Sequence, residues 1–403
     1  MGEIASKLLR LAMEMGASDI HVKVGSPPHV RINGELIPMP QFQRLGANDT
    51  QMLAYDVMNE TQQKLFQERL EIDVGYGIPG LGRFRINIFH QRGTITLSIR
   101  AIPLRIPPFE ELHLPSILSK IAAEQRGLVL VTGTTGSGKT TTLASMIDYI
   151  NNNEAMNIIT IEDPIEYLHR DNKSLISQRE VSVDTFSFAN SLRSALRQDP
   201  DIILVGEMRD QETIETALLA AETGHLVFST LHTTDAIETI NRVIAVFPPH
   251  QQDQIRIQLA SVLSAVLSMR LIKRSDRGGR VPAVEVLRAT DFIRALILDP
   301  LKTKLIRGAI EGGTSQYGMQ SFDQSIFYHY QQGLINYNDA LAYATSPDEF
   351  KLRVQGIYST SGTALEELEK DMHDKMPDIG ASPGGMPKEE SRLEELRKKI
   401  SKR

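Results

Sequence analysis

The chain has 403 residues, of which 41% are hydrophobic and 23% charged, and its formal net charge is −6. Two or three globular domains are expected from this length and balance, and the acidic charge disfavours a protein that coats nucleic acid. The absence of cysteine excludes disulfides, thiolate zinc sites and cysteine nucleophiles, and it is consistent with a reducing cytoplasm.

Residues 1–102 predict a small domain of helices and antiparallel strands. The first segment is an amphipathic helix and lacks the uninterrupted apolar core of a signal peptide. Strand-like runs follow within residues 19–39, and two helical runs lie near residues 49–70. A long hairpin is expected to turn at Arg92 and Gly93, because apolar and polar residues alternate on both sides of this pair.

The remainder of the chain predicts three further regions. Four prolines make residues 103–115 a candidate stiff linker. Short, wholly apolar runs alternate with helices from residue 116 onward, which predicts a parallel α/β sheet buried on both faces. Residues 255–271 predict an apolar helix, too short and too polar to span a bilayer, so membrane association is expected only through a partner or at the periphery. The composition of residues 358–403 predicts a flexible tail.

The motif GTTGSGKT lies between a predicted buried strand and a predicted helix, and it satisfies G-x-x-x-x-G-K-[ST]. Its glycines let backbone N–H groups turn toward phosphate, and the helix N-terminus adds its positive dipole end. Lys139 is expected to reach the outer phosphates of ATP and Thr140 to bind Mg²⁺; a Gly-rich turn without a ligand is the alternative. The predicted nucleotide-binding residues here are Gly133, Thr134, Thr135, Gly136, Ser137, Gly138, Lys139, Thr140 and Thr141.

Two later strands end in acidic residues. In DIILVGEMRD, Gly206 stands where many P-loop proteins have Asp, and Glu207 is expected to orient or deprotonate the attacking water. In TIEDPIEY, Glu162 and Asp163 are candidates to hold the water shell of Mg²⁺. A surface carboxylate and a solvated turn are the respective alternatives.

The stretch ETGHLVFSTLHT places two histidines around a predicted strand. Residues seven apart on a strand point to opposite faces, and without cysteine a zinc site would need two further ligands. A zinc site is therefore not expected. His225 is interpreted as a core or capping residue. His232, preceded by Thr230 at the end of the strand, is interpreted as a sensor that couples phosphate loss to strand movement.

These motifs, in this order, resemble the Walker A, Asp box, atypical Walker B and His box of the secretion ATPase superfamily of type IV pili and type II secretion. The segment GASDIHVKVGSPPHVRINGEL is similar to the PAS-like domain of the PilT-type retraction branch, and GMQSFDQSIFYHYQQGLI is similar to its C-terminal region. The resemblance spans about residues 3–357. The fold it implies is α/β: a PAS-like domain over 1–102, then a RecA-like P-loop ATPase domain with a helical C-terminal part over 116–357.

The resemblance implies a homohexameric motor that couples ATP hydrolysis, with Mg²⁺, to pilus retraction and twitching motility. It also implies a cytoplasmic location, peripheral at the inner membrane through a platform protein and the pilus machinery. In the family pattern, His225 contacts the nucleotide and Glu162 binds Mg²⁺ through water. Catalytic roles fall on the acids of the Asp box and the Walker B motif, on one histidine of the His box and on N-terminal arginines. The matching catalytic candidates are Glu207, Glu162, His232, Arg83, Arg85 and Arg100. Charge on an exposed strand face is the alternative for the arginines.

Three other functions remain open from the sequence. The first is a PilU-like accessory retraction ATPase that assists a primary motor. The second is a non-motor regulator that binds ATP and hardly hydrolyses it, and the third, disfavoured by the acidic charge, is a DNA-translocating ATPase. Assembly-type relatives usually carry a tetracysteine zinc module, and its absence favours retraction over assembly.

Overall fold

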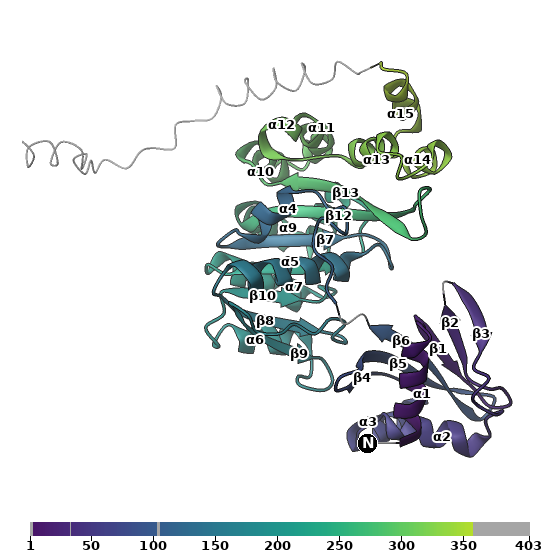
Figure 1. Cartoon of the computed structure of the whole chain (residues 1–403). Coiled ribbons are helices and arrows are strands. Elements are labelled where there is room, and N and C mark those ends of the chain that lie inside the picture. Colours follow the sequence, from purple (N-terminus) through teal and green to yellow (C-terminus); the bar gives the residue numbers. More distant parts are fainter. Residues whose placement is uncertain (1–2, 33, 103–104, 358–403) are drawn as a thin grey trace, which may run out of the picture. The chain divides into compact units, whose positions relative to one another are not determined.

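A computed structural model describes residues 3–32, 34–102 and 105–357 (Figure 1). The predicted tail over 358–403 and the first two residues of the predicted linker lie outside the described residues. Helices accompany two sheets, one of six strands and one of seven. The predicted α/β fold class is confirmed.

The N-terminal sheet is antiparallel throughout and has the order β3-β2-β1-β6-β5-β4. Phe84, Ile86 and Ile88 of β5 are buried and alternate with partly exposed residues, so Arg83 and Arg85 point away from the apolar core. Apolar residues of the three helices complete that core. The elements are α1 (Glu3–Glu14), β1 (Asp19–Val22), β2 (His29–Ile32), β3 (Glu35–Pro38), α2 (Ala47–Asp56), α3 (Glu60–Arg69), β4 (Glu71–Ile78), β5 (Gly82–Gln91) and β6 (Thr94–Ile102).

The second sheet has the order β13-β12-β7-β11-β10-β8-β9, and only β13 runs antiparallel to its neighbour (Figure 1). Successive residues of β7 alternate between two apolar clusters, one with α4 and α5 and the other with α6 to α11. The strands are β7 (Gly127–Thr132), β8 (Asn157–Glu162), β9 (Leu175–Glu180), β10 (Ile202–Val205), β11 (Leu226–Leu231), β12 (Leu263–Lys273) and β13 (Arg280–Arg288).

Helices cover both faces of this sheet and continue beyond its last strand (Figure 1). The first six are α4 (Ile117–Ala122), α5 (Lys139–Asn153), α6 (Phe188–Ala195), α7 (Gln211–Glu222), α8 (Ala236–Ala245) and α9 (Pro249–Val262). The C-terminal ones are α10 (Asp291–Leu298), η1 (Thr303–Leu305), α11 (Ile306–Gly312), α12 (Thr314–Tyr317), α13 (Phe322–Gln331), α14 (Tyr337–Tyr343) and α15 (Pro347–Val354).

The helix predicted over 255–271 is wrong beyond Val262, where α9 ends and β12 begins. In β12, Leu267 pairs with Val131 of β7 on one side and with Val286 of β13 on the other. A continuous apolar run fits a buried strand as well as a buried helix, so periodicity alone cannot separate them. The segment forms a strand because it lies between β7 and β13 in the sheet.

The second half of the predicted linker packs into the core of the second sheet. Phe109 and Leu114 are buried among residues of α4, α5 and β7. The ring of Phe109 stacks on that of Tyr149 in α5, with 5.3 Å between the ring centroids. These contacts fix the chain just before α4 and the P-loop strand.

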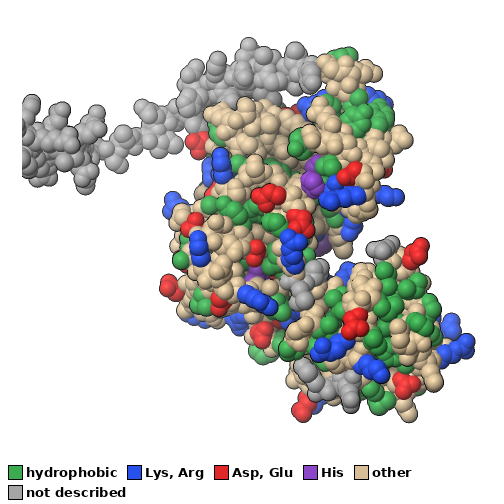
Figure 2. All heavy atoms as spheres, viewed as in Figure 1, with side chains coloured by type: hydrophobic (Ala, Val, Ile, Leu, Met, Phe, Trp, Pro, Cys, Tyr) green, Lys and Arg blue, Asp and Glu red, His purple; other side chains and the backbone are tan. Residues whose placement is uncertain are grey.

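The visible surface carries mixed charge. Figure 2 shows Lys and Arg side chains interspersed with Asp and Glu over the face in view. Among the described residues, no helix has the length and apolar character needed to cross a membrane.

Glu285 on β13 is a buried acid, and its contribution to stability depends on pH. Its carboxylate accepts a hydrogen bond from the backbone N–H of Ala236, at the start of α8, over 2.8 Å. Burial raises the pKa of Glu285 to about 7; Asp235 raises it further, while the Ala236 hydrogen bond and the charges of Arg270 and Arg307 lower it. Between pH 4.5 and 7 the folded protein therefore holds a proton that the unfolded chain releases, so the free energy of unfolding falls as pH rises.

Glu285→Gln is expected to remove this loss, because the amide carries no charge and keeps an oxygen for Ala236. Relative to wild type, the variant should gain up to about 3 kcal/mol in the free energy of unfolding as pH rises from about 4.5 to 7. Thermal unfolding across this range measures the difference, with Glu68→Gln on the exposed side of α3 as the control. Parallel pH curves for wild type and Glu285→Gln would contradict the prediction.

Candidate functional site

Four candidate segments meet at one edge of the parallel sheet. Thr132, the last residue of β7, pairs with Leu231 of β11, and Val205 of β10 pairs with both Ile161 of β8 and Ser229 of β11. The P-loop, the Asp box, Glu207 and His232 therefore follow the carboxyl ends of neighbouring strands. Ligands of open α/β sheets bind at this edge.

The P-loop is a tight turn that only glycine allows at several positions. Gly133, Gly136 and Gly138 have φ values of 142°, 78° and 100°, which L side chains rarely adopt. A Cβ on Gly133 would lie 2.5 Å from the Ser137 side-chain oxygen and 2.6 Å from the carbonyl oxygen of Met269. The loop can therefore close only with glycine at its start.

Lys139 folds back over the loop that precedes it. Its Nζ donates to the carbonyl oxygens of Gly133 and Thr134 over 2.8 and 3.1 Å. Burial lowers the pKa of Lys139, and the charges of Glu207 and Glu166 oppose that shift. An ammonium held at a helix N-terminus suits the phosphates of a nucleotide.

Two further observations test whether the loop fits a phosphate ligand. Ser137 Oγ is buried and has no hydrogen-bond partner among the described residues. Thr134, Thr135 and Gly136 are exposed at the crest of the loop. An unpaired buried polar atom beside a glycine-lined turn fits the phosphate groups of ATP.

The oxygen ligands at this edge suit Mg²⁺. Thr140 lies in the first turn of α5 beside Lys139, and Glu162 ends β8. The described residues contain no group of three or more His, Asp or Glu that could hold a metal ion by themselves. Mg²⁺ in nucleotide sites takes one or two protein oxygens, with phosphate and water as the other ligands. When bound there, it neutralises charge on the phosphates.

Two side chains contact Glu207, one at each carboxylate oxygen. Its carboxylate lies 2.7 Å from the guanidinium of Arg209 and 3.4 Å from Nε2 of His232. Arg209 was not among the residues predicted from the sequence, and its pKa is raised chiefly by its hydrogen bond to Glu207. The only sequence signal for this pair is its spacing of two residues in GEMRD.

The glycine before Glu207 has a packing reason. The N–H of Gly206 donates to the carbonyl oxygen of Ile161 over 2.8 Å, and a Cβ at this position would lie 3.1 Å from that same oxygen. A side chain here would require that carbonyl to shift by a few tenths of an ångström, so the close approach of the strands favours glycine over the aspartate common here in P-loop proteins. Thr230 Oγ1 donates to the carbonyl oxygen of Gly206 over 2.7 Å, so the end of β11 is tied to the Glu207 loop.

His225 lies at the opposite edge of the sheet. Its carbonyl oxygen accepts from the N–H of Gly127 at the start of β7, and its Nδ1 lies 2.8 Å from the carbonyl oxygen of Ala220 at the end of α7. A strand of this length separates it from the P-loop by about 20 Å. The structure does not bring His225 to the P-loop of its own chain, and it places this residue in a turn-stabilising position.

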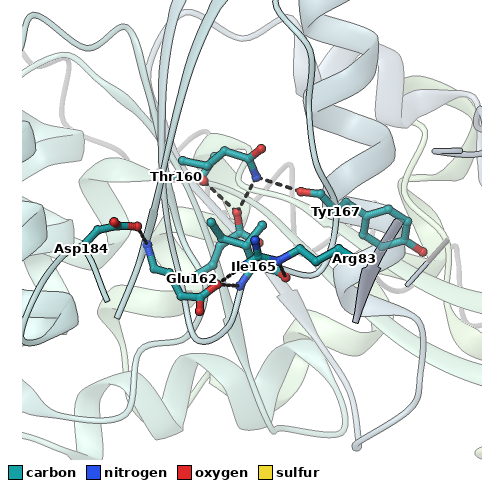
Figure 3. Close-up of polar contacts among 8 residues, drawn as sticks. Arg83, Thr160, Glu162, Ile165, Tyr167 and Asp184 are labelled. Carbon is teal, nitrogen blue, oxygen red and sulfur yellow. Dashed lines mark hydrogen bonds and ion pairs between the residues drawn. The ribbon is translucent and has the colours of Figure 1, made fainter. Parts of the chain in front are cut away.

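Glu162 is set in a hydrogen-bond network with β9 (Figure 3). Its Oε1 accepts from Thr160 Oγ1 over 2.7 Å and from Gln178 Nε2 over 3.0 Å. Burial raises the pKa of Glu162, and these two hydrogen bonds oppose the shift. β9 was not predicted from the sequence, so Gln178 was missed.

The three candidate arginines have different surroundings. Arg83 donates through Nε to the carbonyl oxygen of Ile165 over 3.0 Å and pairs with Glu180 at the end of β9 (Figure 3). Arg85 lies 3.7 Å from both Glu166 and Asp73. The structure therefore brings Arg83 and Arg85 to the segment that follows Glu162.

The side chain of Arg100 has a different partner. Its Nε lies 3.0 Å from the carboxylate of Asp19 on β1, and its side chain is 72% exposed. Arg100 pairs with Arg85 in the ladder between β5 and β6, but its side chain contacts Asp19 and not the Asp-box segment.

The parallel sheet, the P-loop at its carboxyl edge and the two acidic strand ends define a P-loop nucleotide-binding protein. Residues 2–295 match the sequence profile of the type II/IV secretion system proteins. The chain belongs to this family.

Similar proteins match over most of the chain. The type IV pilus retraction ATPase PilT of Pseudomonas aeruginosa is 46% identical over 347 residues, 86% of this chain and 99% of that protein. The type IV pilus ATPase PilU of the same organism is 41% identical over 353 residues, 87% of this chain and 91% of that protein. A crystal structure of the retraction motor PilT with bound ADP has a TM-score of 0.79 and 47% identity, covering 87% of this chain and 98% of that one.

Proposed function

We propose that this chain is a hexameric motor ATPase that couples ATP hydrolysis to type IV pilus retraction and so drives twitching motility. The observation that carries the proposal is the similarity to PilT, 46% identity over 99% of that protein. The same chain holds the P-loop, Glu162, Glu207 and His232 at one edge of its sheet.

In this mechanism each residue has a defined task toward ATP. Backbone N–H groups of the P-loop and Lys139 hold the phosphates, while Thr140 and, through water, Glu162 hold Mg²⁺. Glu207 orients the attacking water and accepts its proton. His232, which lies 3.4 Å from Glu207, senses the loss of the γ-phosphate.

The division into domains is part of the proposal. Residues 1–102 form the PAS-like domain, 103–115 the connection and 116–357 the ATPase domain, with 358–403 as a tail. Arg83 and Arg85 contact the Asp-box segment, which supports a contribution of the N-terminal domain to hydrolysis. Arginines that stabilise transferred phosphate contribute about 10³- to 10⁵-fold in rate.

The partners of the proposed motor are further copies of the chain and the pilus machinery at the inner membrane. An accessory role remains the second candidate, because PilU is 41% identical over 87% of this chain. Both roles require ATP turnover, whereas a non-motor regulator would bind ATP and hardly hydrolyse it.

The test is pilus retraction in cells of the source organism that lack this protein. A primary motor predicts extended pili that fail to retract, with rescue by wild-type protein. Retraction that persists and weakens only under load supports the accessory role. Normal retraction under every load, together with negligible turnover of the purified protein, contradicts a motor function.

A further inference from the structure

We propose that Gln178 of β9 is a positioning residue that holds Glu162 in a fixed orientation relative to the P-loop helix, acting together with Tyr167. The proposal rests on the proposed function only in taking Glu162 as the carboxylate that serves the Mg²⁺ of a bound nucleotide. Gln178 itself touches neither nucleotide nor metal.

The side-chain amide of Gln178 is fully engaged. Its Nε2 donates to Glu162 Oε1 over 3.0 Å and to the carbonyl oxygen of Tyr167 over 2.8 Å. Its Oε1 accepts from the backbone N–H of His169 over 2.9 Å. Because the N–H of His169 can only donate and the carbonyl of Tyr167 can only accept, the protein fixes which end of the amide faces Glu162.

Strand register brings the two side-chain donors of Glu162 together. Thr160 of β8 pairs directly with Gln178 in the parallel ladder, and Glu162 pairs with Glu180. Residues two apart on a strand share a face, so Thr160 and Glu162 lie on one face of β8, beside Gln178 on β9. Thr160 and Gln178 both donate to Oε1, so donors from two strands fix that oxygen.

Tyr167 extends the network to the P-loop helix. Its hydroxyl lies 3.1 Å from Oγ1 of Thr141, in the first turn of α5, while its backbone carbonyl accepts from Gln178. The side chain is buried, with 9% of its surface exposed. A continuous series of hydrogen bonds therefore runs from α5 through Tyr167 and Gln178 to Glu162 (Figure 3 shows its last two steps).

The physical consequence concerns orientation. Without the amide, Glu162 retains the Thr160 hydroxyl and the backbone N–H of Glu166 as donors. What it loses is the link through Gln178 and Tyr167 to α5. Partners that orient the ligands of a metal typically contribute about 10- to 100-fold in metal affinity or activity. The P-loop contacts of the nucleotide do not involve Gln178, so binding without metal should be unaffected.

The experiment compares nucleotide binding with and without Mg²⁺ in the full chain. Affinity for a fluorescent ADP analogue is measured in excess Mg²⁺ and in a chelator, for wild type and Gln178→Ala. In the chelator the two proteins should bind equally. In the variant, the factor by which Mg²⁺ strengthens nucleotide binding should fall about 10-fold or more. The Mg²⁺ concentration for half-maximal ATPase activity should rise about 10-fold or more.

Two further variants separate positioning from folding. Tyr167→Phe removes only the hydroxyl contact with Thr141 and should shift the Mg²⁺ dependence in the same direction by a smaller factor. Ser177→Ala, at an exposed position next to Gln178 on β9, is the matched control and should behave as wild type. Thermal unfolding of each variant checks that it is folded.

Two results would overturn the proposal. One is a wild-type response to Mg²⁺ in folded Gln178→Ala. The other is an equal loss of affinity with and without Mg²⁺, which would indicate a general structural role. The binding measurement does not need turnover, so a wild-type protein without ATPase activity would contradict the proposed function while Gln178 could still be tested.

Discussion

Lys139→Ala is expected to lose ATPase activity by about 100- to 1000-fold, the typical cost of removing one preorganised group that stabilises developing charge. Lys139 is the only cation in the motif, and its Nζ lies over the loop at 2.8 Å from the carbonyl oxygen of Gly133. No neighbouring side chain of the loop can replace an ammonium at the phosphates. Steady-state phosphate release at saturating ATP measures the effect.

The same lysine also stabilises the loop through its hydrogen bonds to the carbonyl oxygens of Gly133 and Thr134, so a second variant is needed. Lys139→Gln keeps a side-chain N–H₂ donor, on a chain one bond shorter, and carries no charge. It should preserve the thermal unfolding midpoint and still lose activity. Lys120→Ala, exposed on α4, is the matched control. Wild-type turnover in a folded Lys139→Gln protein would rule out the P-loop mechanism.

The P-loop could be predicted because its information is local. The loop conformation depends on glycines within eight consecutive residues, and the flanking strand and helix are both evident in the sequence. The same holds for Glu207 and Glu162, each at the end of a short apolar strand. These residues are expected at the same edge of the sheet, because parallel strands have their carboxyl ends at one edge.

The supporting residues could not be predicted, because their roles depend on contacts across the sheet. The sequence LISQRE of β9 is polar and lies at the sheet edge, so it has no buried-strand pattern, and Gln178 remained hidden. The strand β12 was taken for a helix because its apolar run is ambiguous without its neighbours. His225 was assigned to the nucleotide through a family motif, although the length of β11 separates it from the P-loop.

The three N-terminal arginines show the same limit. The alternation of β5 predicts that Arg83 and Arg85 share a face, and the structure has both directed away from the domain core. Arg100 lies opposite Arg85 on β6, and only its side-chain contact with Asp19 distinguishes it from the other two. Strand patterns identify which side chains are free of the core, and the fold then decides what they contact.

Glu207→Gln is expected to bind ATP with near wild-type affinity and to hydrolyse it about 100- to 10,000-fold more slowly, the usual contribution of a positioned general base. The amide has nearly the same shape as the carboxylate, and its oxygen still accepts from Arg209, which lies 2.7 Å from Glu207. It cannot take a proton from water. Glu215→Gln, exposed on α7, controls for loss of an acidic charge nearby.

Comparing the change in kcat with the change in ATP affinity decides the role of Glu207. If it activates water, kcat falls while the affinity for ATP is kept, because ground-state contacts with the phosphates come from the P-loop. If it binds Mg²⁺ directly, affinity in the presence of Mg²⁺ falls with kcat, and the assignment of metal binding to Thr140 and Glu162 is wrong. High residual turnover with collapsed ATP affinity would leave Glu207 a ligand, and the base would have to be sought elsewhere at this edge of the sheet.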